Sequence, residues 1–318
     1  MNLRIGSRGS QLALWQANHI ADLLRSQGHT VEIEIIKTTG DRLQEITFAQ
    51  VGSKGMFTKE IEEALASGRV HLAVHSLKDL PTDLPEQFTL AAVPPRVDPR
   101  DAFVSAKYTS LASLPPGAKV GTSSSRRRSQ LKAIRPDIEA IEFRGNVDTR
   151  LRKLGEGQVD AILLAAAGLD RLGRTDWIRE RLDPPIFCPA AGQGALGIET
   201  RRDDYGIIQA LAFLDNPDTR FAVTAERIAL AALGGGCQVP IGIHCRQNLS
   251  HKRSDGSDGP HDEIFGVVAS PETGAMVRIF HTMPRDHHDP EALGRCAAKM
   301  LLSQGAGALL TPIEGAAK

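Results

Sequence analysis

The strongest constraint on the fold is an alternation of strand-like and helix-like segments that two proline-rich stretches interrupt. The first stretch, at 94–101, reads PPRVDPRD, and the second, at 184–189, reads PPIFCP. Proline fixes its own φ and donates no backbone hydrogen bond, so neither stretch continues a helix or a central strand. The pattern predicts two α/β units joined by two extended crossings, and therefore two lobes that hinge about a cleft.

The first α/β unit is expected because the spacing of its apolar residues alternates between the two-residue period of a strand and the 3.6-residue period of a helix. Its predicted strands and helices are Leu3–Ser7, a helix from Ser10, Thr30–Lys37, the helix Thr58–Ser67 and Leu72–Ser76. The last strand runs into the sequence LKDLP, whose proline ends any regular element. Functional side chains of α/β folds lie at such carboxyl ends of strands.

The second α/β unit and the C-terminal part follow the same kind of pattern. The second unit is expected to contain strands Ala102–Ser105, Val120–Thr122, Glu139–Arg144 and Asp160–Leu164, with helices Ser124–Ile134, Asn146–Leu154 and Ala165–Leu172. Beyond it we expect a smaller α+β unit with helix Asp218–Leu233, strands Ile241–Arg246, Ile264–Ala269 and Met276–His281, and helix Pro290–Gln304. The polar segment 247–262 predicts a disordered surface insertion.

Composition narrows the class of protein. Lys+Arg and Asp+Glu are both 38, and aromatic residues make up 4%, which disfavours a globally basic nucleic-acid binder or a base-stacking surface. No apolar run is long enough for a membrane span, and the N-terminus lacks the apolar core of a signal peptide. The cysteines at 188, 237, 245 and 296 form no C-x-x-C pair. We therefore expect reduced thiols, a cytoplasmic protein and no metal site.

The strongest local feature is a basic segment between Gly121 and Arg152, with eight basic and four acidic residues. Arg126 and Arg127 fall in the first turn of a predicted helix, where cations oppose the helix dipole and a nearby anion would relieve the conflict. A solvated helix face and a DNA-binding patch are the alternatives. We favour a site for a polycarboxylate or phosphate ligand, because arginine binds such groups through two parallel hydrogen bonds.

Two further positions have both a functional and a structural interpretation. Lys78 and Asp79 are either a surface ion pair or functional groups at the end of a strand. Cys237 follows three glycines, so it is either a small buried apolar residue or an accessible nucleophile. The sequence GQGALG at 192–197 fits a dinucleotide motif but leads into a strand-like segment, so we exclude that function.

A set of segments resembles the porphobilinogen deaminase (hydroxymethylbilane synthase) family over nearly the whole chain. Each segment is weak alone, and the set in this order is specific. The segments are RGSQLALWQ at 8–16, GSKGMF at 52–57, AVHSLKDLP at 73–81, DPRDAF at 98–103, GTSSSRR at 121–127, RGNVDTR at 144–150, AAAGLDRLG at 165–173, PAAGQGA at 189–195 and GGCQVPIG at 235–242.

The resemblance implies an enzyme of three domains. Domain 1 would comprise 1–95 and 195–215, domain 2 would comprise 99–190, and domain 3 would comprise 218–318. The first two would be α/β lobes like type II periplasmic binding proteins, with the active cleft between them, and the third a smaller α+β domain. The implied reaction is the head-to-tail polymerisation of four porphobilinogen molecules, with loss of ammonia, to the linear tetrapyrrole hydroxymethylbilane in heme biosynthesis. The enzyme would be a monomer.

The resemblance also implies roles for single residues. Cys237 would anchor a dipyrromethane cofactor as a thioether, and Asp79 would be the catalytic carboxylate. The residues implied to bind the cofactor and substrate are Arg8, Ser10, Lys54, Ser76, Lys78, Thr122, Ser124, Arg126, Arg127, Arg144, Arg150, Arg171 and Gln193. The chain departs from the family pattern at Gly234 and Ser125, neither of which replaces a chemical group. The rival interpretation is an anion-binding module, which would need neither Cys237 nor Asp79.

Overall fold

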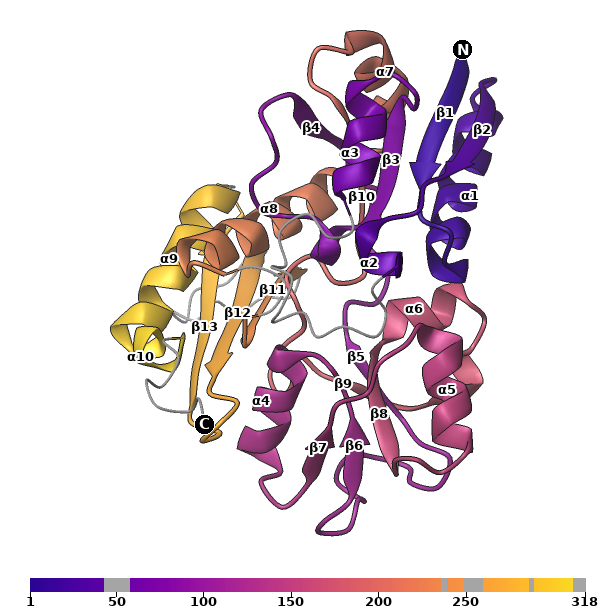
Figure 1. The fold of residues 1–318 in the computed structure, drawn as a ribbon. Coiled ribbons are helices and arrows are strands. Elements are labelled where there is room, and N and C mark those ends of the chain that lie inside the picture. The colour runs from indigo at the N-terminus through magenta and orange to yellow at the C-terminus, as the bar shows by residue number, and fades with distance from the viewer. Residues whose placement is uncertain (43–57, 236–238, 249–259, 286–288, 311–318) are drawn as a thin grey trace. The chain divides into compact units, whose positions relative to one another are not determined.

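The structure is a computed structural model that describes residues 1–42, 58–235, 239–248, 260–285 and 289–310. The chain divides into two compact units. The first comprises Met1–Pro99, Ala165–Thr175 and Gly192–Arg220, and the second comprises the rest of the chain. Each unit is built around its own sheets (Figure 1).

A five-stranded sheet with the order β2-β1-β3-β10-β4 forms the centre of the first unit. Its strands are β1 (Asn2–Ser7), β2 (Thr30–Ile35), β3 (Leu72–Ser76), β4 (Phe88–Ala92) and β10 (Leu196–Arg201). Strand β1 is parallel to β2 and β3, and β10 is antiparallel to β3 and β4. The helices of this unit are α1 (Gln11–Ser26), α2 (Thr39–Arg42), α3 (Lys59–Ala66), α6 (Ala166–Arg171) and α7 (Tyr205–Leu211).

Helix α1 illustrates how the sequence specifies this unit. Ser10 is its N-cap, and the Ser10 side chain accepts a hydrogen bond from the backbone N–H of Ala13 at 3.3 Å. Ala17, Ile20 and Leu24 are spaced three and four residues apart, and each is fully buried against the sheet. The first turn of α1 therefore starts at the carboxyl end of β1.

The second unit contains a five-stranded sheet with the order β7-β6-β8-β5-β9. Its strands are β5 (Asp101–Val104), β6 (Lys119–Gly121), β7 (Glu139–Ile141), β8 (Ala161–Ala165) and β9 (Ile178–Leu182). Strand β6 is parallel to β7 and β8, and β5 is antiparallel to β9. Helices α4 (Ser125–Ile134) and α5 (Val147–Gly155) follow β6 and β7. The parallel core thus has the same order, second–first–third strand, as the core of the first unit.

The C-terminal part of the second unit is a three-stranded antiparallel sheet with helices. It consists of β11 (Ile241–Asn248), β12 (His261–Ala269), β13 (Met276–Pro284), α9 (Pro290–Ser303) and α10 (Ala306–Leu310). Helix α8 (Pro217–Ala232) begins in the first unit and belongs to the second from Phe221 onward. Leu293, Ala297 and Leu301 of α9 share an apolar core with Ile243 and Ile264 of the sheet. No helix within the described ranges is long and apolar enough to cross a membrane.

The expected fold class, two α/β sheets and a smaller α+β part, is confirmed. The boundaries of the three domains and the cleft between the first two stay predictions. The prediction of a disordered insertion was wrong at both ends of the segment. Gln247 pairs with Asp262, and Asn248 pairs with His261, in the β11–β12 ladder. Backbone hydrogen bonds sustain that ladder despite the polar side chains. Residues 249–259 lie outside the described residues.

Candidate active site

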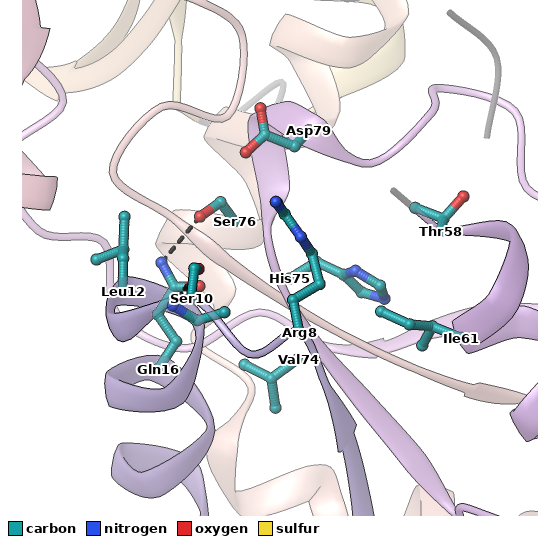
Figure 2. Close-up of a pocket in the computed structure, with 11 residues that line it drawn as sticks. Arg8, Ser10, Leu12, Gln16, Thr58, Ile61, Val74, His75, Ser76 and Asp79 are labelled. Atoms are coloured by element: carbon teal, nitrogen blue, oxygen red, sulfur yellow. Dashed lines mark hydrogen bonds between the residues drawn. The ribbon is translucent and has the colours of Figure 1, made fainter. Parts of the chain in front are cut away.

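A pocket of about 90 Å³ lies at the carboxyl ends of β1 and β3 in the first unit (Figure 2). These strands are parallel neighbours, so the residues that follow them meet at one edge of the sheet. Arg8 and Ser10 come from the end of β1, and Ser76 and Asp79 come from the end of β3. The structure therefore brings four of the predicted site residues together.

Asp79 occupies the open side of this pocket. It is the last residue of the short 3₁₀ helix Leu77–Asp79, and its side chain is exposed. Asp79 forms no ion pair with any side chain in the described part of the chain. Figure 2 shows the Arg8 side chain extending from the end of β1 toward Asp79. A carboxylate is thus placed at the edge of a pocket that Arg8 also lines.

The two serines of the pocket are held in place by the protein. Ser10 caps α1, and the Ser76 hydroxyl accepts a hydrogen bond of 2.8 Å from the Gln16 amide. Gln16 is 2% exposed and lines the pocket, yet sequence reasoning did not select it. Gln16 lies in α1 within two turns of the Ser10 cap, on the side that faces the sheet. That position was the signal that could have indicated a pocket residue.

Arg171 and Gln193 belong to the first unit, outside this pocket. Burial lowers the pKa of Arg171 to about 10, although Asp170 partly opposes the shift. Its guanidinium lies 5.8 Å from the centre of the Trp15 ring and donates to the Gly194 carbonyl at 2.8 Å. Its Nε is buried without a hydrogen-bond partner among the described residues. Gln193 is 1% exposed, and its amide donates to the Pro99 carbonyl at 2.7 Å, which is a structural contact.

In the second unit, Arg126 and Arg127 enclose the fully buried Asp101. Arg126 donates to both carboxylate oxygens, at 2.7 and 3.2 Å, and Arg127 donates to Oδ1 at 2.9 and 2.7 Å. Burial alone would raise the pKa of Asp101, but the two guanidinium charges outweigh burial and hold it well below its usual range. Sequence reasoning missed Asp101, because no local pattern marks it as a buried counterion.

Arg150 and Arg144 add positive charge near Arg127. Burial lowers the pKa of Arg150 to about 10, with further lowering by the charges of Arg127 and Arg144 and partial opposition from Glu142. The Arg150 Nε is buried without a hydrogen-bond partner in the described ranges. Arg144 donates to Glu142 at 2.7 Å. A buried guanidinium with an unused donor beside other cations suits a carboxylate ligand.

The remaining predicted residues have structural contacts or lie outside the described residues. Thr122 is 1% exposed, and Ser124 caps α4 by accepting a hydrogen bond from the Arg127 N–H at 3.4 Å. Lys78 is half-buried in the 3₁₀ helix beside Asp79. Lys54 and Cys237 lie outside the described residues. Cys188 and Cys245 are buried and Cys296 is half-buried, and none of the three forms a disulfide within the described residues.

A dipyrromethane group carries an acetate and a propionate on each of its pyrrole rings, and each unit by itself contains a buried arginine donor that suits a carboxylate. The unused Nε atoms of Arg150 and Arg171, both buried, are donors that match carboxylates. Within the described residues, no cluster of His, Cys, Asp and Glu side chains is arranged to hold a metal ion.

Comparison with solved structures returns periplasmic binding proteins. The methionine binding protein MetQ covers 67% of this chain and 89% of its own, with a TM-score of 0.42 and 14% identity. A periplasmic substrate-binding protein from Coxiella burnetii covers 67% of this chain and 91% of its own, with a TM-score of 0.41 and 17% identity.

Comparison with protein families and curated relatives is more specific. Residues 3–209 match the family model "Porphobilinogen deaminase, dipyromethane cofactor binding domain", and residues 220–303 match "Porphobilinogen deaminase, C-terminal domain". A porphobilinogen deaminase of Nitratidesulfovibrio vulgaris (strain Miyazaki F) is 49% identical over 98% of this chain and 97% of its own length. The one from Geobacter sulfurreducens is 46% identical over 98% of this chain and 94% of its own length. The chain belongs to the porphobilinogen deaminase family, as its motifs predicted.

Proposed function

We propose that this protein polymerises four porphobilinogen molecules head to tail, with release of ammonia, to hydroxymethylbilane. The family match supports the reaction. The position of Asp79 is the observation that supports assigning the reaction to the pocket. This exposed carboxylate stands at the edge of a pocket that Arg8, Ser10 and Ser76 also line. The substrate carries an aminomethyl group and two carboxylates, so one site must stabilise a cation and bind anions.

Asp79 has the charge that the reaction requires. When the C–N bond of porphobilinogen breaks, its electron pair leaves with ammonia and the remaining pyrrolylmethyl group is a cation. A fixed carboxylate stabilises that cation more than it stabilises the neutral ring, so it lowers the barrier to ammonia loss. Arg8 supplies the opposite charge in the same pocket, where it can pair with a substrate carboxylate.

The cofactor is proposed to be a dipyrromethane bound through a thioether to Cys237. When bound, this group supplies the pyrrole carbon at which the chain starts. Arg144, Arg150 and Arg171 are proposed to hold its carboxylates, with Arg126, Arg127 and Lys78 as further cations. Arg150 and Arg171 are the strongest candidates, because each has a buried donor that no described residue uses.

The mass of the intact protein tests the cofactor and its anchor together. We expect the purified wild-type chain to exceed its sequence mass by one dipyrromethane, and Cys237→Ser to lack that increment. A hydroxyl is a far poorer nucleophile than a thiolate, so the variant cannot capture the pyrrolylmethyl carbon. Cys296→Ser, which changes a half-buried thiol on α9, is the matched control and should retain the adduct. An adduct on Cys237→Ser would place the anchor elsewhere, and an unmodified wild type without turnover would favour an anion-binding module.

The proposed carboxylate clamps give a second prediction. Arg150→Lys and Arg144→Lys keep the charge but lose the two-pronged geometry, so we expect substrate binding to weaken or elongation to stall at a short enzyme-bound chain. Native mass spectra after substrate addition would resolve the stalled species. Arg152→Lys is the control on the same helix, because Arg152 is 61% exposed and pairs with Glu156. Identical product distributions in all three variants would contradict the clamp role.

We also propose that the enzyme acts as a cytoplasmic monomer without a nucleic-acid partner. The balanced charge, with 38 basic and 38 acidic residues, supports the absence of a nucleic-acid partner. The three described cysteines form no disulfide with one another, which supports a reducing compartment. Light scattering coupled to gel filtration measures the oligomeric state directly.

A further inference from the structure

His75 and Glu199 form a buried pair beneath the pocket that contains Asp79. His75 is in β3, Glu199 is in the neighbouring β10, and His75 Nε2 lies 2.9 Å from Glu199 Oε2. The side chains are 7% and 0% exposed. His75 lines the pocket with Arg8 and Asp79, and Figure 2 shows its ring between the Arg8 side chain and Ile61. The pair therefore connects the pocket to a carboxylate that solvent does not reach.

The hydrogen bond determines which ring nitrogen is basic. An ionised carboxylate only accepts hydrogen bonds, so Nε2 of His75 carries the hydrogen that Glu199 accepts. Neutral His75 then has its lone pair on Nδ1, and Nδ1 makes no hydrogen bond within the described part of the chain. A carboxylate behind an imidazole both orients the ring and stabilises the imidazolium that a proton would create.

A further acidic side chain, Glu62, interacts with the buried pair. Glu62 of α3 interacts electrostatically with both members of the pair. Burial, followed by the Glu199 charge, raises the pKa of Glu62, while the interaction with His75 opposes the shift. The pocket adds Asp79 and, as the opposing cation, Arg8. Glu199, in hydrogen-bond contact, and Glu62 are thus the carboxylates that interact with the His75 imidazole.

The proposed reaction needs a proton acceptor other than Asp79. Every new carbon–carbon bond leaves the attacking pyrrole carbon with a hydrogen that must depart as a proton before the ring is aromatic again. If Asp79 kept this proton, it would lose the charge that stabilises the next cation. A separate acceptor, for which a neutral imidazole is chemically suited, avoids that conflict.

We propose that His75, oriented by Glu199, accepts the proton that each condensation releases. The aminomethyl group of the substrate reacts as an ammonium, so its C–N electron pair leaves with neutral ammonia, and the methylene carbon bonds to the attacking pyrrole carbon. The C–H electron pair of that carbon returns to the ring, and its proton goes to Nδ1 of His75 and then to the departed ammonia, as ammonium. The inference rests on the proposed function.

Porphobilinogen deuterated at its free α-carbon tests the role, because that position loses its hydrogen in the next coupling. His75→Gln should lower the single-turnover rate about a hundredfold and reveal a primary isotope effect that the wild type lacks. Glu199→Gln should lower the rate less and in the same direction. His71→Gln is the control: His71 precedes the same strand and accepts a hydrogen bond from the Arg4 N–H, away from the pocket. It should behave like the wild type.

The outcomes separate this inference from the proposed function. A wild type that makes no hydroxymethylbilane overturns the function itself. With an active wild type, a His75→Gln rate within about threefold of it, or a slow variant without an isotope effect, overturns the proton-acceptor role. Nitrogen-15 spectra of histidine-labelled protein give a readout independent of turnover. We expect the hydrogen of neutral His75 on Nε2; a hydrogen on Nδ1 would contradict the assignment.

Discussion

Asp79→Asn is expected to slow ammonia release from porphobilinogen about a thousandfold while the protein stays folded. A carboxylate about 4 Å from the developing cation stabilises it by about 4 kcal/mol at an effective dielectric near 20. At about 1.36 kcal/mol per decade this corresponds to the expected loss in rate. Asparagine keeps the shape of the side chain but removes its charge. The exposure of Asp79 on a short 3₁₀ helix makes loss of the fold an implausible cause.

Two companion variants sharpen the measurement. Asp79→Glu retains the charge but displaces it, so its single-turnover rate should fall between those of wild type and Asp79→Asn. Asp83→Asn changes another exposed carboxylate in the following loop and should react like the wild type. If Asp79→Asn reacted within about tenfold of the wild type, Asp79 would not be the carboxylate that stabilises the cation.

The sequence was sufficient to predict the part of the site that depends on local pattern. The apolar run Leu72–Ser76 predicted a strand, and the proline after LKDL predicted its end. Asp79 was therefore expected at the carboxyl edge of a sheet, where the structure has it. The same reasoning placed Ser10 at the start of a helix. Such features are specified by neighbours in the chain, so a sequence pattern can report them.

Contacts between distant segments could not be predicted in this way. His75 and Glu199 are 124 residues apart, and the pairing of β3 with β10 is what brings them together. Asp101 was the last residue of a proline-rich break and was given no role, whereas it begins β5 and is fully buried. The edge strands β4 and β9 were missed because their apolar residues do not form a clear alternation.

The buried Asp101 is expected to have the largest effect on stability. The side chains of Arg126 and Arg127 are 7% exposed or less. Asp101→Asn therefore leaves two buried guanidinium groups without their common counterion. Removing one partner from a buried ionic group costs about 3–5 kcal/mol, a large part of a typical total stability. Urea unfolding monitored by circular dichroism would measure the loss. Asp183→Asn breaks an exposed pair with Arg100 and should cost about 1 kcal/mol or less.

The dependence of this stabilisation on pH distinguishes an ionic role from a packing role. The folded-state pKa of Asp101 lies below its unfolded value of about 3.9, so its contribution is fully present above about pH 4 and is lost as the pH falls further. The difference in unfolding free energy between wild type and Asp101→Asn should therefore shrink on acidification below about pH 4. A difference that stayed constant through this range would mean that Asp101 stabilises the fold by shape and hydrogen bonding, and that its charge is not what holds the first turn of α4 to β5.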